Sequence, residues 1–137
     1  MFGLACALGD ESMLRVKAVL FDLDGTILDI TERDAYARYQ ALNDLGYSVS
    51  LDDVRKRYRH GIGSMGILKE LGIRLPEEKE KDYVEKSFAH FTNRENALNL
   101  TKIHNGAFDV LSTLSKKYTL GLVTSRDRLS STEEELE

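Results

Sequence analysis

The sequence lacks most of the features that mark secreted, membrane-spanning or nucleic-acid-binding proteins. Its 137 residues include one cysteine, Cys6, which excludes an internal disulfide and agrees with a reducing, cytoplasmic location. No apolar run is long enough to cross a membrane, so we expect no membrane partner. The net charge is −4 and no aromatic platform accompanies the basic residues, which argues against a nucleic-acid partner. The composition, 42% hydrophobic and 31% charged, is that of a soluble globular domain.

The first twelve residues are expected to lie outside the fold. Residues 1–9 are apolar, but they lack a basic start and are too short for an export signal. Met13 is a more natural beginning for a chain whose first strand starts near Val16. We therefore predict that residues 1–12 are an extension or a misassigned start.

The most informative segment, residues 22–27, reads Asp-Leu-Asp-Gly-Thr-Ile and follows an apolar run over residues 16–21. Because side chains alternate faces along a strand, Asp22 and Asp24 should point the same way and share one ligand. Open parallel sheets bind ligands beyond the carboxyl ends of their strands, which places this pair at a binding edge. Two carboxylates this close repel unless a cation lies nearby, and Mg²⁺ suits carboxylates together with phosphate.

This pair of carboxylates can carry out phosphate transfer. Aspartate can form a covalent aspartyl-phosphate, and a second carboxylate within reach can act as general acid for the leaving oxygen. One alternative is a calcium loop, but such a loop has its glycine in sixth place, whereas Gly25 is fourth. The other alternative, a surface turn, would not normally follow so apolar a run.

A second segment near the end of the chain has a related pattern. Residues 105–107, Asn-Gly-Ala, open an amphipathic helical pattern that closes at two lysines. Residues 118–125 then read as a second buried strand ending in the hydroxyls of Thr124 and Ser125. Alone, a strand that ends in Thr-Ser is a weak signal, and a helix N-cap would be the favoured explanation.

Residues 19–26 match the first motif of the haloacid dehalogenase superfamily at every position, and the strand ending at Thr124 resembles the second motif. The resemblance implies an α/β fold with a Rossmann-like parallel sheet, of which this chain holds the first two core strands. It implies that Asp22 is the nucleophile and a Mg²⁺ ligand, and that Asp24 is the acid/base, whose main-chain carbonyl also contacts the metal. The phosphate-binding residues that it implies are Thr124, Ser125, Gly25 and Thr26.

The residues between the two motifs, about 29–105, are too many for a plain crossover and should form a domain of their own. Their spacing predicts helices over 32–45, 50–58, 64–71 and 76–91, and no strand. Such an insert resembles the helical cap of phosphoglycolate phosphatases and β-phosphoglucomutases, which closes over the site and selects the substrate. The predicted domains are an extension, 1–12, a partial core, 13–30 with 101–137, and a cap, 31–100.

A glycine-rich stretch within the cap, residues 61–66, reads as a literal G-x-G-x-x-G. It follows a charged helix instead of a buried strand, so the dinucleotide-binding interpretation is rejected. In the resembling enzymes a flexible cap loop at this point reaches into the active site. The candidates for contact with the distal part of the substrate are Arg57, Arg59, His60 and Ser64, although a solvated helix face explains any single one of them somewhat better.

Beyond Thr124 the sequence contains neither the phosphate-clamping lysine of the family's third motif nor the acidic metal ligands of the fourth. Lys102, at the return from the cap, is a candidate phosphate contact, against the simpler reading of an exposed hinge lysine. We expect an N-terminal fragment with little activity alone and with apolar sheet surfaces exposed. Such a core could be completed by a dimer, by a complementing chain or by residues absent from this sequence.

Three functions are consistent with the motifs. The first is a Mg²⁺-dependent phosphatase that acts on a small phosphorylated metabolite through an aspartyl-phosphate. The second is a sugar phosphomutase, which returns the phosphoryl group to a sugar. The third is a non-catalytic binding or regulatory module that reuses the cap.

Overall fold

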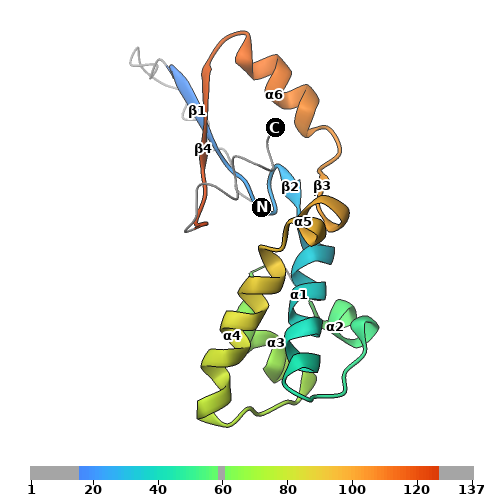
Figure 1. Cartoon of the computed structure of the whole chain (residues 1–137). Helices are drawn as coiled ribbons and strands as arrows, with labels where there is room; N and C mark the ends of the chain where they lie inside the picture. Colours follow the sequence, from blue (N-terminus) through green and yellow to red (C-terminus); the bar gives the residue numbers. More distant parts are fainter. Residues whose placement is uncertain (1–15, 59–60, 127–137) are drawn as a thin grey trace.

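The computed structural model describes residues 16–58 and 61–126, and its two halves lie at opposite ends of the molecule (Figure 1). One half holds a sheet and one helix, and the other is a bundle of helices. The elements in chain order are β1 Ala18–Asp22, β2 Leu28–Asp29, α1 Thr31–Asp44, α2 Leu51–Arg57, α3 Gly63–Leu71, α4 Glu77–Phe91, α5 Arg94–Leu100, β3 Lys102–Ile103, α6 Ala107–Ser115 and β4 Thr119–Val123. Cys6 and the predicted extension lie outside the described residues.

The α/β arrangement expected from the sequence is confirmed. Within the described residues, β1 and β4 pair in parallel, with Asp22 opposite Val123, and α6 precedes β4 along one side of the pair (Figure 1). The parallel register brings the ends of the two strands, and therefore both predicted motifs, to one edge of the sheet.

The strands are much less buried than their apolar sequences predicted. Leu20 on β1 is 66% exposed, Phe108 on α6 is 73% exposed, and none of the described residues of α6 is buried. The expectation that both strands are buried is therefore wrong for this chain, because two strands and one helix cannot cover both faces of a sheet. The expectation that apolar surfaces would remain exposed is confirmed.

The helical half has a continuous hydrophobic core. Helices α1 and α4 form the main packed pair, and α2 and α3 close over them (Figure 1). Local signals set the helix ends as predicted: the Ser50 side chain caps α2 by accepting the Asp53 N–H at 3.0 Å, and Gly72 ends α3 with φ 69°. The fully buried members of this core include Ala35, Ala41, Leu42, Val54, Ile67 and Tyr83.

Two predictions about this region are wrong. Helix α5 was not expected, because Ala97 is its only buried residue and no apolar stripe marks it. The expectation of no strand between the motifs also fails, because β2 and β3 form a short antiparallel pair where the chain enters and leaves the helical half. A strand of two residues has too few positions to show an alternating pattern.

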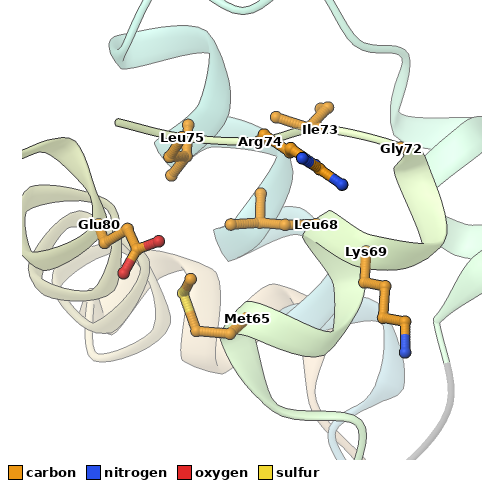
Figure 2. A pocket seen from close by; sticks show the side chains of 8 residues that line it. All are labelled: Met65, Leu68, Lys69, Gly72, Ile73, Arg74, Leu75 and Glu80. Atoms are coloured by element: carbon orange, nitrogen blue, oxygen red, sulfur yellow. The ribbon is translucent and has the colours of Figure 1, made fainter. Parts of the chain in front are cut away.

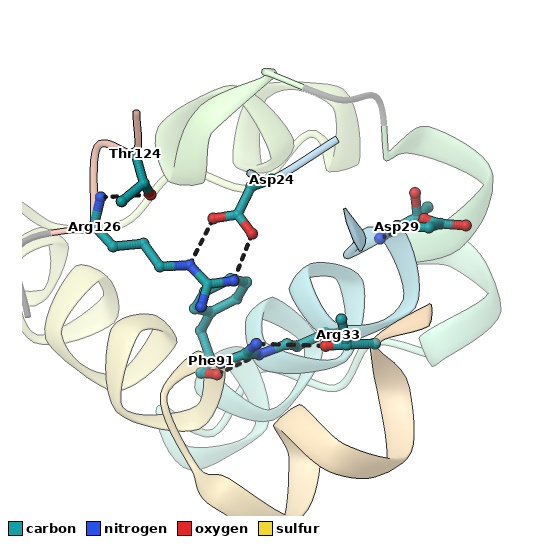
Figure 3. A network of polar contacts seen from close by, with 8 residues as sticks. Asp24, Asp29, Arg33, Phe91, Thr124 and Arg126 are labelled. Carbon is teal, nitrogen blue, oxygen red and sulfur yellow. Dashed lines mark hydrogen bonds and ion pairs between the residues drawn. The ribbon is translucent and has the colours of Figure 1, made fainter. Parts of the chain in front are cut away.

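A buried arginine holds this junction together. Arg33 on α1 is 1% exposed, and its Nε donates to the Phe91 carbonyl at 2.6 Å (Figure 3). Its Nη1 donates to Thr101 Oγ1 at 3.4 Å, and its guanidinium lies 4.1 Å from the centre of the Phe91 ring. Arg33 thus links the start of α1 to the end of α4 and to the chain returning toward the sheet.

None of the described helices is long and apolar enough to span a membrane.

Candidate active site

The loop that follows β1 is held by its own backbone. The Leu23 carbonyl accepts the N–H groups of Ile27 at 3.0 Å and Leu28 at 2.9 Å, and the Leu23 side chain is fully buried. Gly25 has φ 77°, a backbone conformation that side-chain-bearing residues rarely adopt, which explains the glycine of the motif. The loop therefore presents Asp22 and Asp24 from a defined backbone.

Asp22 and Thr124 lie at the same edge of the sheet. Asp22 is exposed at the end of β1, opposite Val123, and Thr124 directly follows β4. Thr124 Oγ1 accepts the Arg126 N–H at 3.2 Å, which leaves its own hydroxyl proton available to donate to a ligand. The sequence-predicted nucleophile and phosphate-binding hydroxyl are thus on neighbouring strand ends, while their chemical roles stay predictions.

Asp24 forms an ion pair that sequence reasoning missed. Arg126 donates from Nε to Asp24 Oδ2 at 2.7 Å and from Nη2 to Oδ1 at 2.5 Å (Figure 3). The Arg126 guanidinium also lies 5.7 Å from the centre of the Phe91 ring on the helical half. The available signal was an arginine two positions after Thr124, at the end of the strand expected beside the carboxylates. Arg126 therefore connects the sheet to the predicted acid/base and to α4.

A pocket of about 280 Å³ lies between the two halves, and we call it the interdomain pocket. The sheet side and the helical side both supply polar side chains to it, and Phe88 and Phe91 add apolar surface. Of the predicted residues, the pocket brings together Asp24, Ser125 and Ser64. Its other polar lining residues are Asp34, Ser87 and Arg126.

Several predicted residues do not meet at this pocket. Arg57 donates to Asp53 Oδ1 at 3.1 Å and borders a different hollow, which favours the reading of a solvated helix face. Arg59 and His60 lie outside the described residues. Thr26 lines a third hollow, beside His104 and α6.

Lys102 lies in the junction between the halves. It is exposed, and the β2–β3 register places it opposite Asp29. The pKa of Asp29 is lowered mainly by hydrogen bonds from Thr31, with smaller contributions from His104 and Lys102. This position agrees with the simpler reading of Lys102 as a hinge lysine, and its contact with phosphate stays a prediction.

A larger hollow, of about 560 Å³, lies within the helical half (Figure 2). Its apolar floor includes Met65, Leu68 and Leu75, and Lys69, Arg74 and Glu80 stand around it (Figure 2). No residue of the sheet or of the loop after β1 lines it. We therefore place the candidate active site at the smaller interdomain pocket, which Asp24 lines, and at the sheet edge beside it, where Asp22 and Thr124 lie outside the pocket lining.

The wall of the interdomain pocket on the helical side contains a second carboxylate. Asp34 accepts hydrogen bonds from Arg38 Nε at 3.1 Å, from Arg38 Nη2 at 2.8 Å and from the Tyr58 hydroxyl at 2.8 Å. Burial, and then the charge of Asp34, raise the pKa of Tyr58 well above its ordinary range. The Tyr58 hydroxyl therefore stays protonated and donates to Asp34.

The oxygen donors at the end of β1 match Mg²⁺ in kind. The exposed Asp22 carboxylate is available, and the Asp24 carbonyl accepts no backbone N–H from a described residue. Within residues 16–58 and 61–126, no group of three acidic, histidine or cysteine side chains converges on one point. These groups would offer two oxygen donors to such an ion, and Mg²⁺ in proteins commonly takes its remaining ligands from substrate phosphate and water.

One family of known proteins matches most of this chain. The model of the haloacid dehalogenase-like hydrolase family matches residues 19–137. A comparison with curated proteins gives no significant match.

Solved structures resemble the chain over most of its length. A protein from Clostridium difficile assigned as a phosphatase is 26% identical, covers 88% of this chain and aligns over 54% of its own, with TM-score 0.70. A protein from Haemophilus somnus assigned as a phosphoglycolate phosphatase is 24% identical over 82% and 52% of the two chains, with TM-score 0.60. YfnB from Bacillus subtilis, a magnesium-bound protein assigned as a hydrolase, is 21% identical over 89% and 59%, with TM-score 0.55. This chain therefore spans between half and three fifths of the length of each.

Proposed function

The chain belongs to the haloacid dehalogenase-like hydrolase family, and from this premise we propose that it carries the nucleophile-bearing part of a phosphatase for a small phosphorylated metabolite. The observation that supports the proposal most directly is the shared edge of β1 and β4. Asp22 is the last residue of β1, and Thr124 directly follows its partner Val123 at the end of β4. The interdomain pocket beside this edge has room for the rest of a small substrate. No observation favours the sugar phosphomutase or the non-catalytic module over this function.

The proposed reaction has two steps. In the first, an Asp22 carboxylate oxygen attacks phosphorus, the ester bond to the leaving oxygen breaks, and Asp24 gives that oxygen a proton. In the second, Asp24 takes a proton from water, which attacks the aspartyl-phosphate and releases inorganic phosphate. Both Asp24 oxygens accept from Arg126, so Asp24 must release at least one of these hydrogen bonds to reach the leaving oxygen.

We propose Mg²⁺ as the cofactor, held by the Asp22 carboxylate and the Asp24 carbonyl. When bound, the ion would offset the negative charge of the phosphoryl group and the carboxylates. The magnesium-bound YfnB structure has the same fold and supports the choice of metal. The Thr124 hydroxyl, which already accepts the Arg126 N–H, would donate its proton to a phosphoryl oxygen.

We further propose that residues 1–137 alone have little activity and that the protein works in the cytoplasm. Phosphoryl transfer depends mainly on positioning and charge stabilisation. The described residues place no lysine in the interdomain pocket, and the sheet-side surfaces of α6 and β4 are largely exposed. A second copy, a complementing chain or further residues of the same protein would supply the clamp and cover these surfaces.

The test compares the full-length protein with the 137-residue chain on p-nitrophenyl phosphate. We expect the full-length protein to require Mg²⁺, to lose activity with EDTA, and to lose at least about a thousandfold in kcat in Asp22→Asn. Asp109→Asn, an exposed aspartate on α6, serves as the matched control and should retain activity. Metal-dependent hydrolysis that survives Asp22→Asn would exclude this function, and brisk turnover by the 137 residues alone would exclude their dependence on a completing part.

A further inference from the structure

Arg126 holds Asp24 in an arrangement that does not allow the proposed acid step. Its Nε and Nη2 donate to the two carboxylate oxygens of Asp24 at 2.7 and 2.5 Å. The pair is largely enclosed, because the Arg126 side chain is 9% exposed and the Asp24 side chain is 21% exposed. A protonated carboxyl has to turn its O–H toward the leaving oxygen, so at least one of these bonds has to break first.

The backbone of Arg126 is tied to the predicted phosphate-binding hydroxyl. Its N–H donates to Thr124 Oγ1 at 3.2 Å, and Thr124 directly follows Val123, the partner of Asp22 across the strand pair. Arg126 therefore contacts Thr124 through its main chain and Asp24 through its side chain. Among the described residues that line the interdomain pocket, Arg126 is the only cation.

The Phe91 ring holds the guanidinium at the pocket without using its N–H donors. The guanidinium carbon of Arg126 lies 5.7 Å from the centre of this ring. A cation near an aromatic ring is attracted by the ring electrons, whereas the N–H donors of a guanidinium lie in its own plane. This contact can therefore persist while the donors change partner.

A phosphoryl group is well suited to replace the Asp24 carboxylate on Arg126. The guanidinium fork matches both carboxylate and phosphate, and a phosphate monoester carries the larger charge, about −1.5 to −2 at pH 7. The other acidic residue that lines the pocket, Asp34, already accepts hydrogen bonds from Arg38 and Tyr58. Two anions cannot both occupy the same two donors, so a phosphoryl group that binds them displaces Asp24.

We propose that Arg126 is a phosphate-binding residue, whose guanidinium exchanges the Asp24 carboxylate for oxygens of the substrate phosphoryl group. The same exchange releases Asp24, so the acid becomes available only when phosphate is bound. No covalent bond forms or breaks in this step. The contact adds to the lysine clamp that a completing part would supply. This inference rests on the proposed phosphatase function.

The first measurement follows the guanidinium itself. The Nε–H resonance of Arg126 is recorded by heteronuclear NMR on full-length Asp22→Asn, which prevents turnover, and is assigned by its loss in Arg126→Lys. Saturating inorganic phosphate with Mg²⁺ should shift this resonance, whereas acetate at the same concentration should leave it in place. An unmoved resonance in saturating phosphate overturns the inference, and so does an equal shift with acetate, because the contact would then not be specific for phosphate.

The second measurement is calorimetry with inorganic phosphate and Mg²⁺ in the Asp22→Asn background. Arg126→Gln should weaken binding at least about tenfold, because charge-assisted hydrogen bonds are lost. Arg126→Lys keeps the charge but loses the fork, and should weaken binding less. Arg55→Gln, at a half-exposed arginine outside the interdomain pocket, is the matched control and should stay within about twofold. Unchanged binding in both Arg126 variants overturns the inference.

A double-mutant cycle tests the exchange between the two anions. Asp24→Asn removes the charge that competes for Arg126 and also reduces the repulsion of phosphate. Only the first effect requires Arg126, so Asp24→Asn should tighten phosphate binding at least about fivefold more when Arg126 is present than in Arg126→Gln. Equal tightening in both would show that the two residues act independently and would overturn the exchange. Thermal unfolding checks the fold of each variant, and Arg126→Lys replaces Arg126→Gln in the cycle if the latter unfolds.

The outcomes separate this inference from the proposed function. Hydrolysis of p-nitrophenyl phosphate by the wild-type protein is read separately. Phosphate binding that depends on Arg126, without hydrolysis, contradicts the phosphatase function and supports the phosphate contact. Hydrolysis that requires Asp22, with phosphate binding unchanged in both Arg126 variants, supports the function and overturns the contact. The absence of saturable phosphate binding also overturns the inference.

Discussion

The helical half and the sheet half of this chain both carry apolar side chains on their elements but bury them to different extents. In the helical half, Leu42, Val54 and Ile67 are fully buried between helices. In the sheet half, Leu20, Phe108 and Val123 are each more than half exposed. The helices bury their apolar stripes against one another, whereas a parallel sheet needs layers on both faces. The cap-like half can therefore be stable by itself, whereas the sheet half depends on further covering.

The largest expected effect contrasts two leucines. Leu42→Ala removes a fully buried side chain and should lower the free energy of unfolding of the 137-residue chain by about 2–5 kcal/mol. Leu20→Ala, at a side chain that is 66% exposed, should change it by less than about 1 kcal/mol. Urea unfolding followed by circular dichroism measures both. Equal losses would show that the sheet half is as tightly packed as the helical half.

The ion pair that connects the halves is expected to have a smaller effect. Arg126→Gln breaks two charge-assisted hydrogen bonds to Asp24 and the contact with Phe91, and should destabilise the chain by about 1–3 kcal/mol. Arg55→Gln, which breaks exposed ion pairs within the helical half, should cost less than about 1 kcal/mol. The same urea titration compares them, and a larger loss in the Arg55 variant would refute the role of Arg126 as a connector.

A local change in the helical half has a smaller expected effect still. Ser50→Ala removes the side chain that caps α2 and should cost about 1 kcal/mol. Its neighbour Ser48→Ala is the control, because Ser48 precedes the cap and is exposed. Hydrogen exchange of the α2 amides should accelerate in the first variant and stay unchanged in the second. Uniform acceleration across both halves would mean that they unfold as one unit, which contradicts the expectation that the helical half is stable by itself.

The smallest expected effect is a pH dependence of the junction. Hydrogen bonds from Thr31 lower the pKa of Asp29 below 3.8 in the folded chain, so its stabilising contribution is present above pH 3.8 and is lost as the pH falls through the lower, folded pKa. Asp29→Asn should therefore flatten the acid limb of the stability curve slightly below pH 3.8. Chemical unfolding between pH 2 and 6 measures this limb. An unchanged acid limb would exclude a stabilising role for the Asp29 carboxylate.

Local signals made much of this structure predictable. Local residues explain three features: a helix begins after the capping residue Ser50, a helix ends at Gly72, and the chain turns at Gly25. The first needs a capping side chain, and the other two need a positive φ angle. Helix α5 and the β2–β3 pair escaped prediction because one has a single buried residue and the other is too short for a pattern. The burial of β1 and β4 was mispredicted because burial depends on what covers a strand, which its own sequence does not contain.

By itself the sequence determined the family, the positions of Asp22, Asp24 and Thr124, and the order of the main elements, because motif and helix periodicity are encoded over short distances along the chain. Only the tertiary structure decided that Arg126 pairs with Asp24 and that Arg33 donates to the Phe91 carbonyl at the junction of the two halves. These contacts join residues from different parts of the chain, and their partners are set by how the elements pack. A pattern along the chain therefore does not predict these contacts.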